Sequence, residues 1–200
     1  MRIIGGTAAG LILKAPKGFD VRPTPDLVRQ ALFNSLGERV VGTRVLELFG
    51  GTGALSLECL SRGATHAVCV ELARAHGRVI EQNFAATRLP AEMFQLRVQD
   101  VFAALPQLAA AGARFDLVLA DPPYGEKNVN RRSTSFAQKL LDDKQLPKLL
   151  APGGLFLVGH TKRDTLELMP PWKEKKFMKH GDTAIRFLRL PEPESEVGQG

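Results

Sequence analysis

The chain has 200 residues, 44% of them hydrophobic and 24% charged, so it is long enough for one domain with a substantial core, and its composition excludes intrinsic disorder and a disulfide scaffold. Its net charge of +6 comes from its flanks: residues 1–44 and 122–190 carry +4 and +7, residues 45–121 carry −2, and the last ten carry −3. Basic flanks around a mildly acidic centre suit a small-molecule pocket with a polyanion held around it, although solvated lysines alone also produce this balance.

Residues 1–40 are expected to form a small appendage. Arg2–Gly6 and Leu11–Lys14 flank a turn rich in Gly and Ala, which is typical of a hairpin. A helix is predicted over Pro25–Leu36, because Thr24 is a good N-cap and proline is favoured at the first helical position.

Residues 41–190 alternate short apolar runs with amphipathic stretches, which predicts an α/β domain with a doubly wound, mostly parallel sheet. The expected strands are 43–49, 65–71, 93–98, 114–120 and 155–159, and the expected helices are 54–62, 73–87, 101–111 and 140–150. Two further strands, 172–178 and 183–190, are predicted to add an antiparallel edge hairpin, and residues 191–200 are predicted to be a flexible tail.

A glycine-rich turn follows the first strand of this domain, in the stretch Glu47-Leu48-Phe49-Gly50-Gly51-Thr52-Gly53. Ligands of open α/β sheets bind at the carboxyl ends of the strands, where glycines let the backbone approach a nucleotide. Ser56 stands where a dinucleotide fingerprint needs a third glycine, and the chain has no Gly-Lys-Ser/Thr of a Walker loop. The turn therefore favours a nucleoside-bearing ligand without a pyrophosphate.

Acidic residues at the next strand ends extend this pocket. Glu71 ends the second strand, where a carboxylate can accept hydrogen bonds from ribose hydroxyls, and Asp100 with Val101 follows the third strand. Each carboxylate alone is also explained by a helix cap or a solvated loop. Together they indicate a pocket for an adenosine that carries a small group.

The motif Asp121-Pro122-Pro123-Tyr124 directly follows an apolar strand. An exocyclic amine on a heteroaromatic ring is a poor nucleophile, and two acceptors, the Asp121 carboxylate and the Pro122 carbonyl, would direct its lone pair at an incoming methyl group. The prolines fix the backbone, and Tyr124 would stack on the base. By contrast, Met169-Pro170-Pro171-Trp172 has no acceptor at its first position and is predicted to be a turn before an edge strand.

These motifs resemble a known family. Phe49-x-Gly51-x-Gly53 with Asp121-Pro122-Pro123-Tyr124 is similar to class I S-adenosylmethionine-dependent amino-methyltransferases with a Rossmann-like, seven-stranded sheet. The segments Arg2-Ile3-Ile4-Gly5-Gly6, Arg22-Pro23-Thr24 and Arg29-Gln30-Ala31-Leu32-Phe33-Asn34 resemble the RsmD-type guanine-N2 methyltransferases of bacterial small-subunit ribosomal RNA.

The resemblance implies S-adenosylmethionine as methyl donor and the N2 amine of a guanine in 16S rRNA, position 966 in that family, as acceptor within an assembling 30S particle. It implies cofactor contacts by Glu47, Phe49, Gly51, Gly53, Glu71, Leu72, Asp100 and Val101. Ala73 stands where the family usually has an aspartate, and the loop Gly125–Phe136 is longer than is typical.

Cations on the flanks are candidates for contacts to RNA phosphates: Arg2, Lys14, Arg22, Arg29, Arg131 and Arg132. The lysines of residues 173–179 are expected instead to protect an edge strand from aggregation. The alternatives left open are adenine-N6 methylation of DNA or RNA, methylation of a protein glutamine, and a non-catalytic module that binds nucleotide or RNA on the same fold.

Cellular location follows from the cysteines and the apolar runs. Cys59 and Cys69 lie in apolar stretches, which favours buried thiols in a reducing cytosol, and the four histidines are too scattered for a metal site. No apolar run approaches the roughly 18 residues of a membrane span, and the N-terminus lacks the apolar stretch of a signal peptide. We therefore expect a cytoplasmic, monomeric protein without a metal ion.

Overall fold

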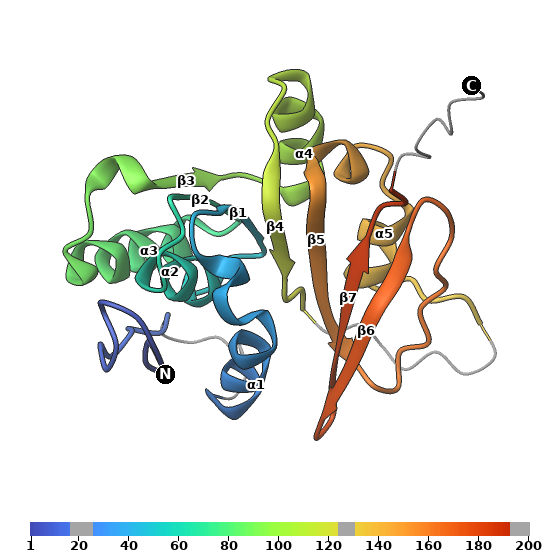
Figure 1. Ribbon diagram of the computed structural model, residues 1–200. Helices are drawn as coiled ribbons and strands as arrows, with labels where there is room; N and C mark the ends of the chain where they lie inside the picture. The colour runs from blue at the N-terminus through green and yellow to red at the C-terminus, as the bar shows by residue number, and fades with distance from the viewer. Residues whose placement is uncertain (17–25, 124–130, 193–200) are drawn as a thin grey trace, which may run out of the picture.

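The computed structural model describes residues 1–16, 26–123 and 131–192, which form an α/β domain around one mixed sheet (Figure 1). The helices are α1 (Asp26–Leu36), α2 (Ala54–Ser61), α3 (Arg74–Thr87), α4 (Val101–Ala110) and α5 (Phe136–Asp142), with short 3₁₀ turns η1 (Gly37–Val40), η2 (Ala91–Met93) and η3 (Leu146–Leu149). The strands are β1 (Arg44–Leu48), β2 (His66–Glu71), β3 (Phe94–Val98), β4 (Phe115–Ala120), β5 (Leu150–Thr161), β6 (Lys173–His180) and β7 (Thr183–Arg189).

The seven strands described are ordered β3-β2-β1-β4-β5-β7-β6, with β3 to β5 parallel and β7 antiparallel to both of its neighbours. The strand order reverses between β1 and β4, because the chain leaves β1 toward β2 and β3 and returns to β4 on the other side. Crevices at such switch points are where open α/β sheets bind their ligands. The predicted Rossmann-like fold with an antiparallel C-terminal hairpin is confirmed.

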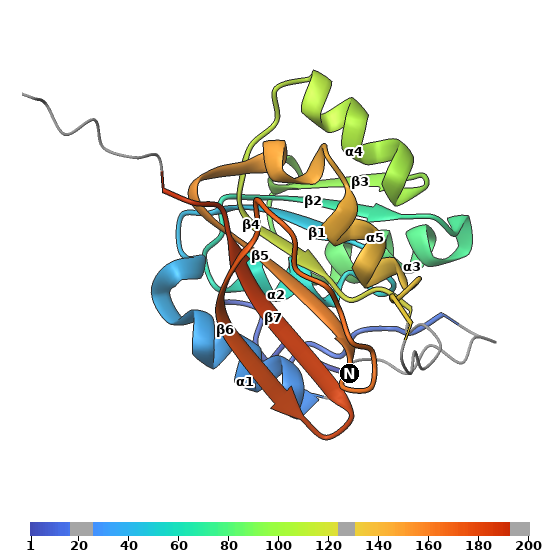
Figure 2. The same ribbon diagram turned by 90° about the vertical axis from the view of Figure 1, so that its right-hand side faces the viewer.

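Helices cover both faces of the sheet, as the parallel strands require (Figure 2). One core cluster joins Leu46 and Leu48 of β1 to residues of α4 and α5, and the other joins Val45 to residues of α1 and α2. Side chains of β1 alternate between these two clusters, since successive residues of a strand point to opposite faces. Cys59 and Cys69 are both buried free thiols, as predicted.

The prediction of a helix over residues 140–150 is wrong. In the structure α5 ends at Asp142, and a 3₁₀ turn over Leu146–Leu149 leads into β5. The Asp143 carboxylate accepts the backbone N–H groups of Gln145 and Leu146, each at 2.8 Å, and so offers the backbone a turn in place of a continuous helix. Strand β5 is correspondingly longer than predicted, because it begins at Leu150 and passes through the Pro152–Gly154 stretch.

The expected N-terminal hairpin forms without regular strands: Arg2 and Ile12 make an isolated antiparallel bridge, the Ile3 N–H donates to the Leu11 carbonyl at 2.9 Å, and the Leu13 N–H donates to the Met1 carbonyl at 3.0 Å. Buried polar side chains of the domain hold this segment in place. The Glu58 carboxylate accepts the N–H groups of Ile4 and Gly5 at 2.7 and 2.9 Å, and Asn83 bonds to both the N–H and the carbonyl of Lys14. Residues 1–16 therefore complete the face formed by α2 and α3.

At the C-terminal end, β6 and β7 form the expected hairpin, with β6 at the edge of the sheet. The Met169–Trp172 stretch is a turn, as predicted, because the Trp172 N–H donates to the Met169 carbonyl at 3.1 Å just before β6 begins. Among the described helices, none is both long and apolar enough to cross a membrane.

Candidate active site

The glycine turn after β1 occupies the switch point of the sheet. Phe49, Gly51 and Gly53 all adopt positive φ angles, of 60°, 58° and 73°, so the chain reverses sharply before α2 begins at Ala54. A Cβ atom built on Gly51 would meet only the Phe49 carbonyl oxygen, at 4.0 Å. At Gly51 the backbone therefore faces open space in which a ligand can approach it closely.

Glu47 stabilises the glycine turn where it leads into α2. Its carboxylate is 2% exposed and accepts the N–H groups of Leu55 and Ser56, at 3.2 and 3.0 Å, at the start of α2. Burial raises the pKa of Glu47 to about 7, although the hydrogen bonds from Ser56 and Leu55 act in the opposite direction. The predicted cofactor contact by the Glu47 side chain is not available here, because the carboxylate is enclosed and holds the helix.

Glu71, at the end of β2, joins the second strand to the glycine turn. One of its oxygens accepts the Gly51 N–H at 2.8 Å, and the other accepts the Ala73 N–H at 2.9 Å and lies 3.3 Å from His76 Nδ1. A carboxylate has about four lone-pair positions, so one acceptor position remains for a ligand hydroxyl. The neighbouring Leu72 is 66% exposed and projects from the same strand end.

Asp100 and Val101 begin α4 beside β3. Asp100 is exposed and caps the helix by accepting the Ala103 N–H at 3.1 Å, and Val101 is buried in the core. The sequence allowed either a helix cap or a cofactor contact for Asp100, and the structure contains the helix cap. An exposed carboxylate at this edge keeps further acceptor positions for a ligand amine or hydroxyl.

Three aromatic rings meet next to the glycine turn, a feature that sequence reasoning did not single out. Phe49 lies 5.4 Å from Phe136 and 6.4 Å from Phe102, measured between ring centroids. Phe102 follows Asp100 by two positions, and Phe136 begins α5, so the rings come from three separate segments. In the sequence, the only signal of this apolar wall is that each phenylalanine stands just after a strand or a loop.

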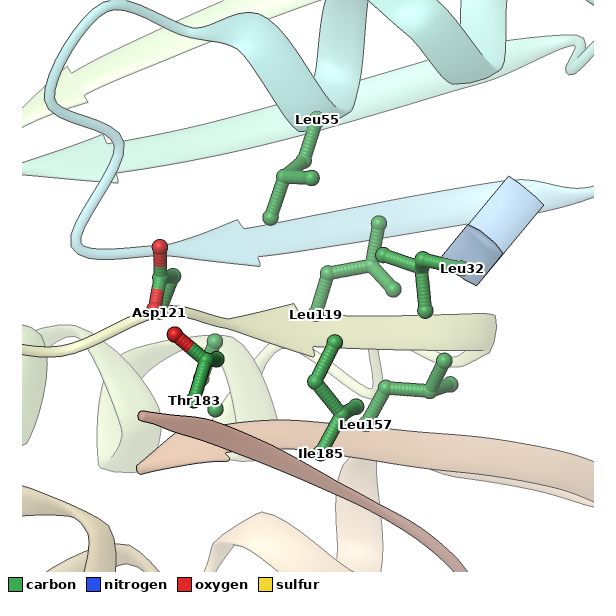
Figure 3. Close-up of a pocket in the computed structure, with 9 residues that line it drawn as sticks. Leu32, Leu55, Leu119, Asp121, Leu157, Thr183 and Ile185 are labelled. Atoms are coloured by element: carbon green, nitrogen blue, oxygen red, sulfur yellow. The ribbon is translucent and has the colours of Figure 1, made fainter. Parts of the chain in front are cut away.

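Asp121 and Pro122 follow β4, across the switch point from the glycine turn. The Asp121 side chain is partly buried and lines a small, open pocket. The other lining residues are almost all apolar: Leu32, Leu55, Leu119, Ala120, Leu157, Gly159, Thr183 and Ile185. Figure 3 shows the Asp121 carboxylate and the Thr183 side chain close together at one end of this pocket, with the leucines along its length.

Gly159 of β5 makes room for the Asp121 carboxylate. A Cβ atom at Gly159 would lie 2.7 Å from Asp121 Oδ1, a distance that real Cβ atoms do not tolerate. A glycine within an apolar strand is a sequence signal for such a close approach. Pro122 is buried and Pro123 exposed beyond this point, and Tyr124 lies outside the described residues.

The expected phosphate contacts divide into four groups, of which Arg29 is the last. Arg2, Lys14 and Arg131 are exposed, and Lys14 Nζ donates to Gln82 at 3.1 Å. Arg132 is half exposed but pairs with Asp142 and Glu167 at 2.7 and 2.9 Å. Arg22 lies outside the described residues.

Arg29 was wrongly expected to contact RNA. Its side chain is 1% exposed, and its guanidinium donates to the Arg2 carbonyl and to Asp26. A phosphate cannot reach a guanidinium buried in this way, so Arg29 fastens α1 to the N-terminal segment. Within the described parts of the chain, no group of His, Cys, Asp or Glu side chains is arranged to hold a metal ion.

Comparisons with known proteins agree with this architecture. The family model described as Conserved hypothetical protein 95 matches residues 1–189. Ribosomal RNA small subunit methyltransferase D of Escherichia coli (strain K12) is 38% identical over 124 residues, which are 62% of this chain and 60% of that protein. YlbH of Bacillus subtilis (strain 168), provisionally named an rRNA methyltransferase, is 32% identical over 81% of this chain and 83% of its own length.

A solved structure of the Escherichia coli protein yhhF, provisionally named a methyltransferase, is 30% identical with a TM-score of 0.75, and the match covers 96% of this chain and 99% of that one. The likeness thus extends over almost the whole fold. The chain belongs to the family described as Conserved hypothetical protein 95, and its resemblance to the RsmD-type methyltransferases is confirmed.

Proposed function

We propose that this protein transfers a methyl group from S-adenosylmethionine to the exocyclic N2 amine of a guanine in small-subunit ribosomal RNA. The observation that carries the proposal is the position of Asp121 and Pro122 at the switch point of the sheet, opposite the glycine turn. The names of its relatives in Escherichia coli and Bacillus subtilis support ribosomal RNA as the class of acceptor.

The residues present fit an adenosine-bearing sulfonium. Gly51 leaves open space at the turn, and the side chains at the next two strand ends are carboxylates with acceptor positions to spare, Glu71 and Asp100. Acceptors of this kind suit ribose hydroxyls and amines, and their negative charge suits a cationic ligand. Phe49 and Phe102 would form an apolar wall beside a flat ring. When bound, S-adenosylmethionine supplies an electrophilic methyl group.

The residues of β4 and β5 would prepare the acceptor. The Asp121 carboxylate and the Pro122 carbonyl accept the two hydrogens of the amine, which favours a pyramidal nitrogen with its lone pair directed at the methyl group. Leucine side chains around Asp121 exclude water and so strengthen these hydrogen bonds. Once the carbon–nitrogen bond has replaced the carbon–sulfur bond of the sulfonium, the methylated nitrogen would be strongly acidic and would give its proton to solvent, so this arrangement requires no general base with a shifted pKa.

Asp121→Ala tests this role. We expect the rate of tritium transfer from labelled S-adenosylmethionine into 16S rRNA to fall by about 100-fold, because one of the two acceptors for the amine is lost. The dissociation constant of the cofactor, measured by calorimetry, should change by less than about threefold. Transfer at more than half the wild-type rate would contradict the proposal.

The same proposal extends to the setting of the reaction. We infer that the acceptor is the RNA of an assembling 30S particle, that the enzyme acts as a monomer, and that it works in the cytoplasm, where ribosomes assemble. Tyr124 is predicted to stack on the extruded base.

A further inference from the structure

Thr183 begins β7 beside Asp121, and the motifs of the sequence assign it no role. It pairs with Thr161 of β5, and Ile185 pairs with Gly159 two positions further along the same ladder. Side chains two positions apart in a strand share a face, which is why Thr183 and Ile185 both line the Asp121 pocket. Thr183 is only 8% exposed, so its hydroxyl is largely enclosed in the wall of this pocket.

The Thr183 hydroxyl faces the Asp121 side chain. Figure 3 shows its oxygen pointing toward the Asp121 carboxylate, with the leucine side chains further along the pocket. Of the described residues that line the pocket, Thr183 alone carries a hydroxyl group and Asp121 alone a carboxylate. A buried hydroxyl that lacks a hydrogen-bond partner costs free energy. Among these side chains, the carboxylate is the acceptor that can satisfy it.

Gly159 of β5 contacts the same carboxylate from a second side. A Cβ atom on Gly159 would lie 2.7 Å from Asp121 Oδ1 and 3.5 Å from Asp121 Cγ, so the carboxylate lies directly against the backbone of β5. Because Ile185 is the cross-strand partner of Gly159, Thr183 is a diagonal neighbour of Gly159 on the same face. Diagonal neighbours are about 7 to 8 Å apart, a spacing at which one side chain can contact both. Strands β5 and β7 therefore enclose the Asp121 side chain from two sides.

The orientation of this carboxylate decides whether it can serve the acceptor amine. The bond between Cβ and Cγ of an aspartate has no sharp rotational preference, and the leucines around Asp121 offer no donor that would hold the carboxylate. A hydroxyl donor occupies one of about four acceptor positions and leaves the others for the amine. Because this bond is made to a charged group in apolar surroundings, it is stronger than a hydrogen bond between neutral groups in water.

We propose that Thr183 is a positioning residue for methyl transfer: its hydroxyl donates a hydrogen bond to the Asp121 carboxylate and holds it against Gly159, with an oxygen directed at the acceptor amine. The inference rests on the proposed function, because it takes Asp121 as the acceptor of an amine hydrogen. In this role Thr183 acts through Asp121 and contacts neither the cofactor nor the amine. Its loss should therefore slow the methyl-transfer step and leave the binding of RNA and cofactor intact.

Three substitutions separate the Thr183 hydroxyl from the shape of the side chain and from stability. Thr183→Val removes the donor and keeps the branched shape that suits a strand, whereas Thr183→Ser keeps the donor and removes a methyl group. Thr43→Val is the matched control, because it makes the same change at the opposite end of the sheet. The Thr43 hydroxyl donates to the Val40 carbonyl at 2.6 Å, so its loss also removes a hydrogen bond.

Each full-length variant is assayed for tritium transfer from labelled S-adenosylmethionine into an undermethylated 16S rRNA fragment. We expect Thr183→Val to lower the single-turnover rate about tenfold or more, the loss typical of a hydrogen bond to a charged group. KM for the fragment and the dissociation constant of the cofactor should each change by less than about threefold. Thr183→Ser should retain at least about a third of the wild-type rate, and Thr43→Val should stay within about twofold of wild type.

A double-variant cycle shows whether Thr183 acts through Asp121. In an Asp121→Ala background the carboxylate is absent, so Thr183→Val should lower both the transfer rate and the free energy of unfolding much less than it does in the wild-type chain. Equal losses in the two backgrounds would overturn the inference and assign the hydroxyl to a backbone acceptor. A Thr183→Val rate within about twofold of wild type would overturn it as well.

The same cycle measured by urea unfolding requires no RNA. A wild-type protein that transfers no methyl group to RNA would overturn the proposed function, and the coupling between Thr183 and Asp121 in the free energy of unfolding would still decide whether the hydroxyl holds the carboxylate. The two failures are therefore distinguishable.

Discussion

Glu47 shows at the residue scale how the glycine turn is held. It is a buried carboxyl group whose two oxygens accept N–H groups at the start of α2, and its pKa is raised from 4.5 to about 7 by burial. The protonated form is therefore favoured in the folded protein over a range in which the unfolded chain has already released its proton. Stability contributed by this proton is present below pH 4.5 and is lost as the pH rises through about 7.

Glu47→Gln removes this titration. The difference in unfolding free energy between the variant and wild type should shift in favour of the variant by up to about 3 kcal/mol between pH 5 and pH 8, because only the wild type must ionise a buried group. Urea unfolding at several pH values measures this difference. A constant difference across the range would show that Glu47 titrates normally in the folded state.

Gly159 is a second residue that we expect to matter for the candidate active site, because it leaves room for Asp121. Gly159→Ala should lower the methyl-transfer rate at least tenfold with little change in cofactor affinity, because the new Cβ would displace the Asp121 carboxylate from 2.7 Å away. The variant is also expected to be less stable than wild type. Single-turnover transfer and urea unfolding give the two quantities.

A double-variant cycle provides the control for Gly159. In an Asp121→Ala background the carboxylate is absent, so Gly159→Ala should cost much less stability than it does in the wild-type chain. An equal cost in both backgrounds would mean that the glycine serves the backbone of β5 and not Asp121.

At the scale of elements, the N-terminal segment depends on α3. Asn83 of α3 is 2% exposed and bonds to the N–H and carbonyl of Lys14 and to the carbonyl of Thr52 in the glycine turn, at 2.8, 3.0 and 3.0 Å. One side chain thus joins the N-terminal segment to the cofactor-side turn. The segment belongs to the structure of the site although it contributes no regular strand.

Asn83→Ala should lower the free energy of unfolding by about 3 kcal/mol, because it leaves three backbone groups without their partner. It should also weaken cofactor binding through the Thr52 end of the turn. Gln82→Ala is the matched control: Gln82 makes an exposed contact with Lys14 Nζ, and its loss should cost less than about 0.5 kcal/mol. Equal costs for the two variants, measured by urea unfolding, would contradict this account of the segment.

Regular elements were predictable where local pattern and tertiary packing agree. The apolar runs that form β1, β2 and β4 and the amphipathic helices α2 to α4 lie close to their predicted bounds. The helix expected over 140–150 failed because the Asp143 side chain competes for backbone N–H groups, which hydrophobic spacing does not report. The N-terminal hairpin was predictable from its local pattern, but its attachment through Glu58 and Asn83, which are distant in the sequence, was not.

The site was predictable only in part for a related reason. Motifs placed the glycine turn, Glu71 and Asp121 at adjoining strand ends, because parallel strands bring their carboxyl ends to one edge. The burial of Arg29 and the room that Gly159 leaves for Asp121 depend on contacts between segments far apart in the chain.

At the scale of the whole molecule, the division of charge along the sequence corresponds to positions in and around the candidate active site. The acidic centre of residues 45–121 contains the glycine turn and the carboxylates at the strand ends, and cations of both flanks lie on segments that adjoin the site. The Arg2 carbonyl accepts a hydrogen bond from Arg29 of α1, and Arg29 lies one helical turn before Leu32, which lines the pocket. The Lys162 N–H donates to the Asp182 carbonyl at the tip of the β6–β7 hairpin. This arrangement suits an RNA strand that crosses the mouth of the Asp121 pocket.

The central claim is the identity of the methylated group, and mapping it tests the claim most directly. Undermethylated 30S particles, free 16S rRNA and duplex DNA are incubated with the protein and labelled S-adenosylmethionine, and the products are digested and analysed by mass spectrometry. We predict N2-methylguanine at one site of the 16S rRNA, formed by wild type and lost with Asp121→Ala. Label in N6-methyladenine or in protein glutamine, or no label in any acceptor, would contradict the account.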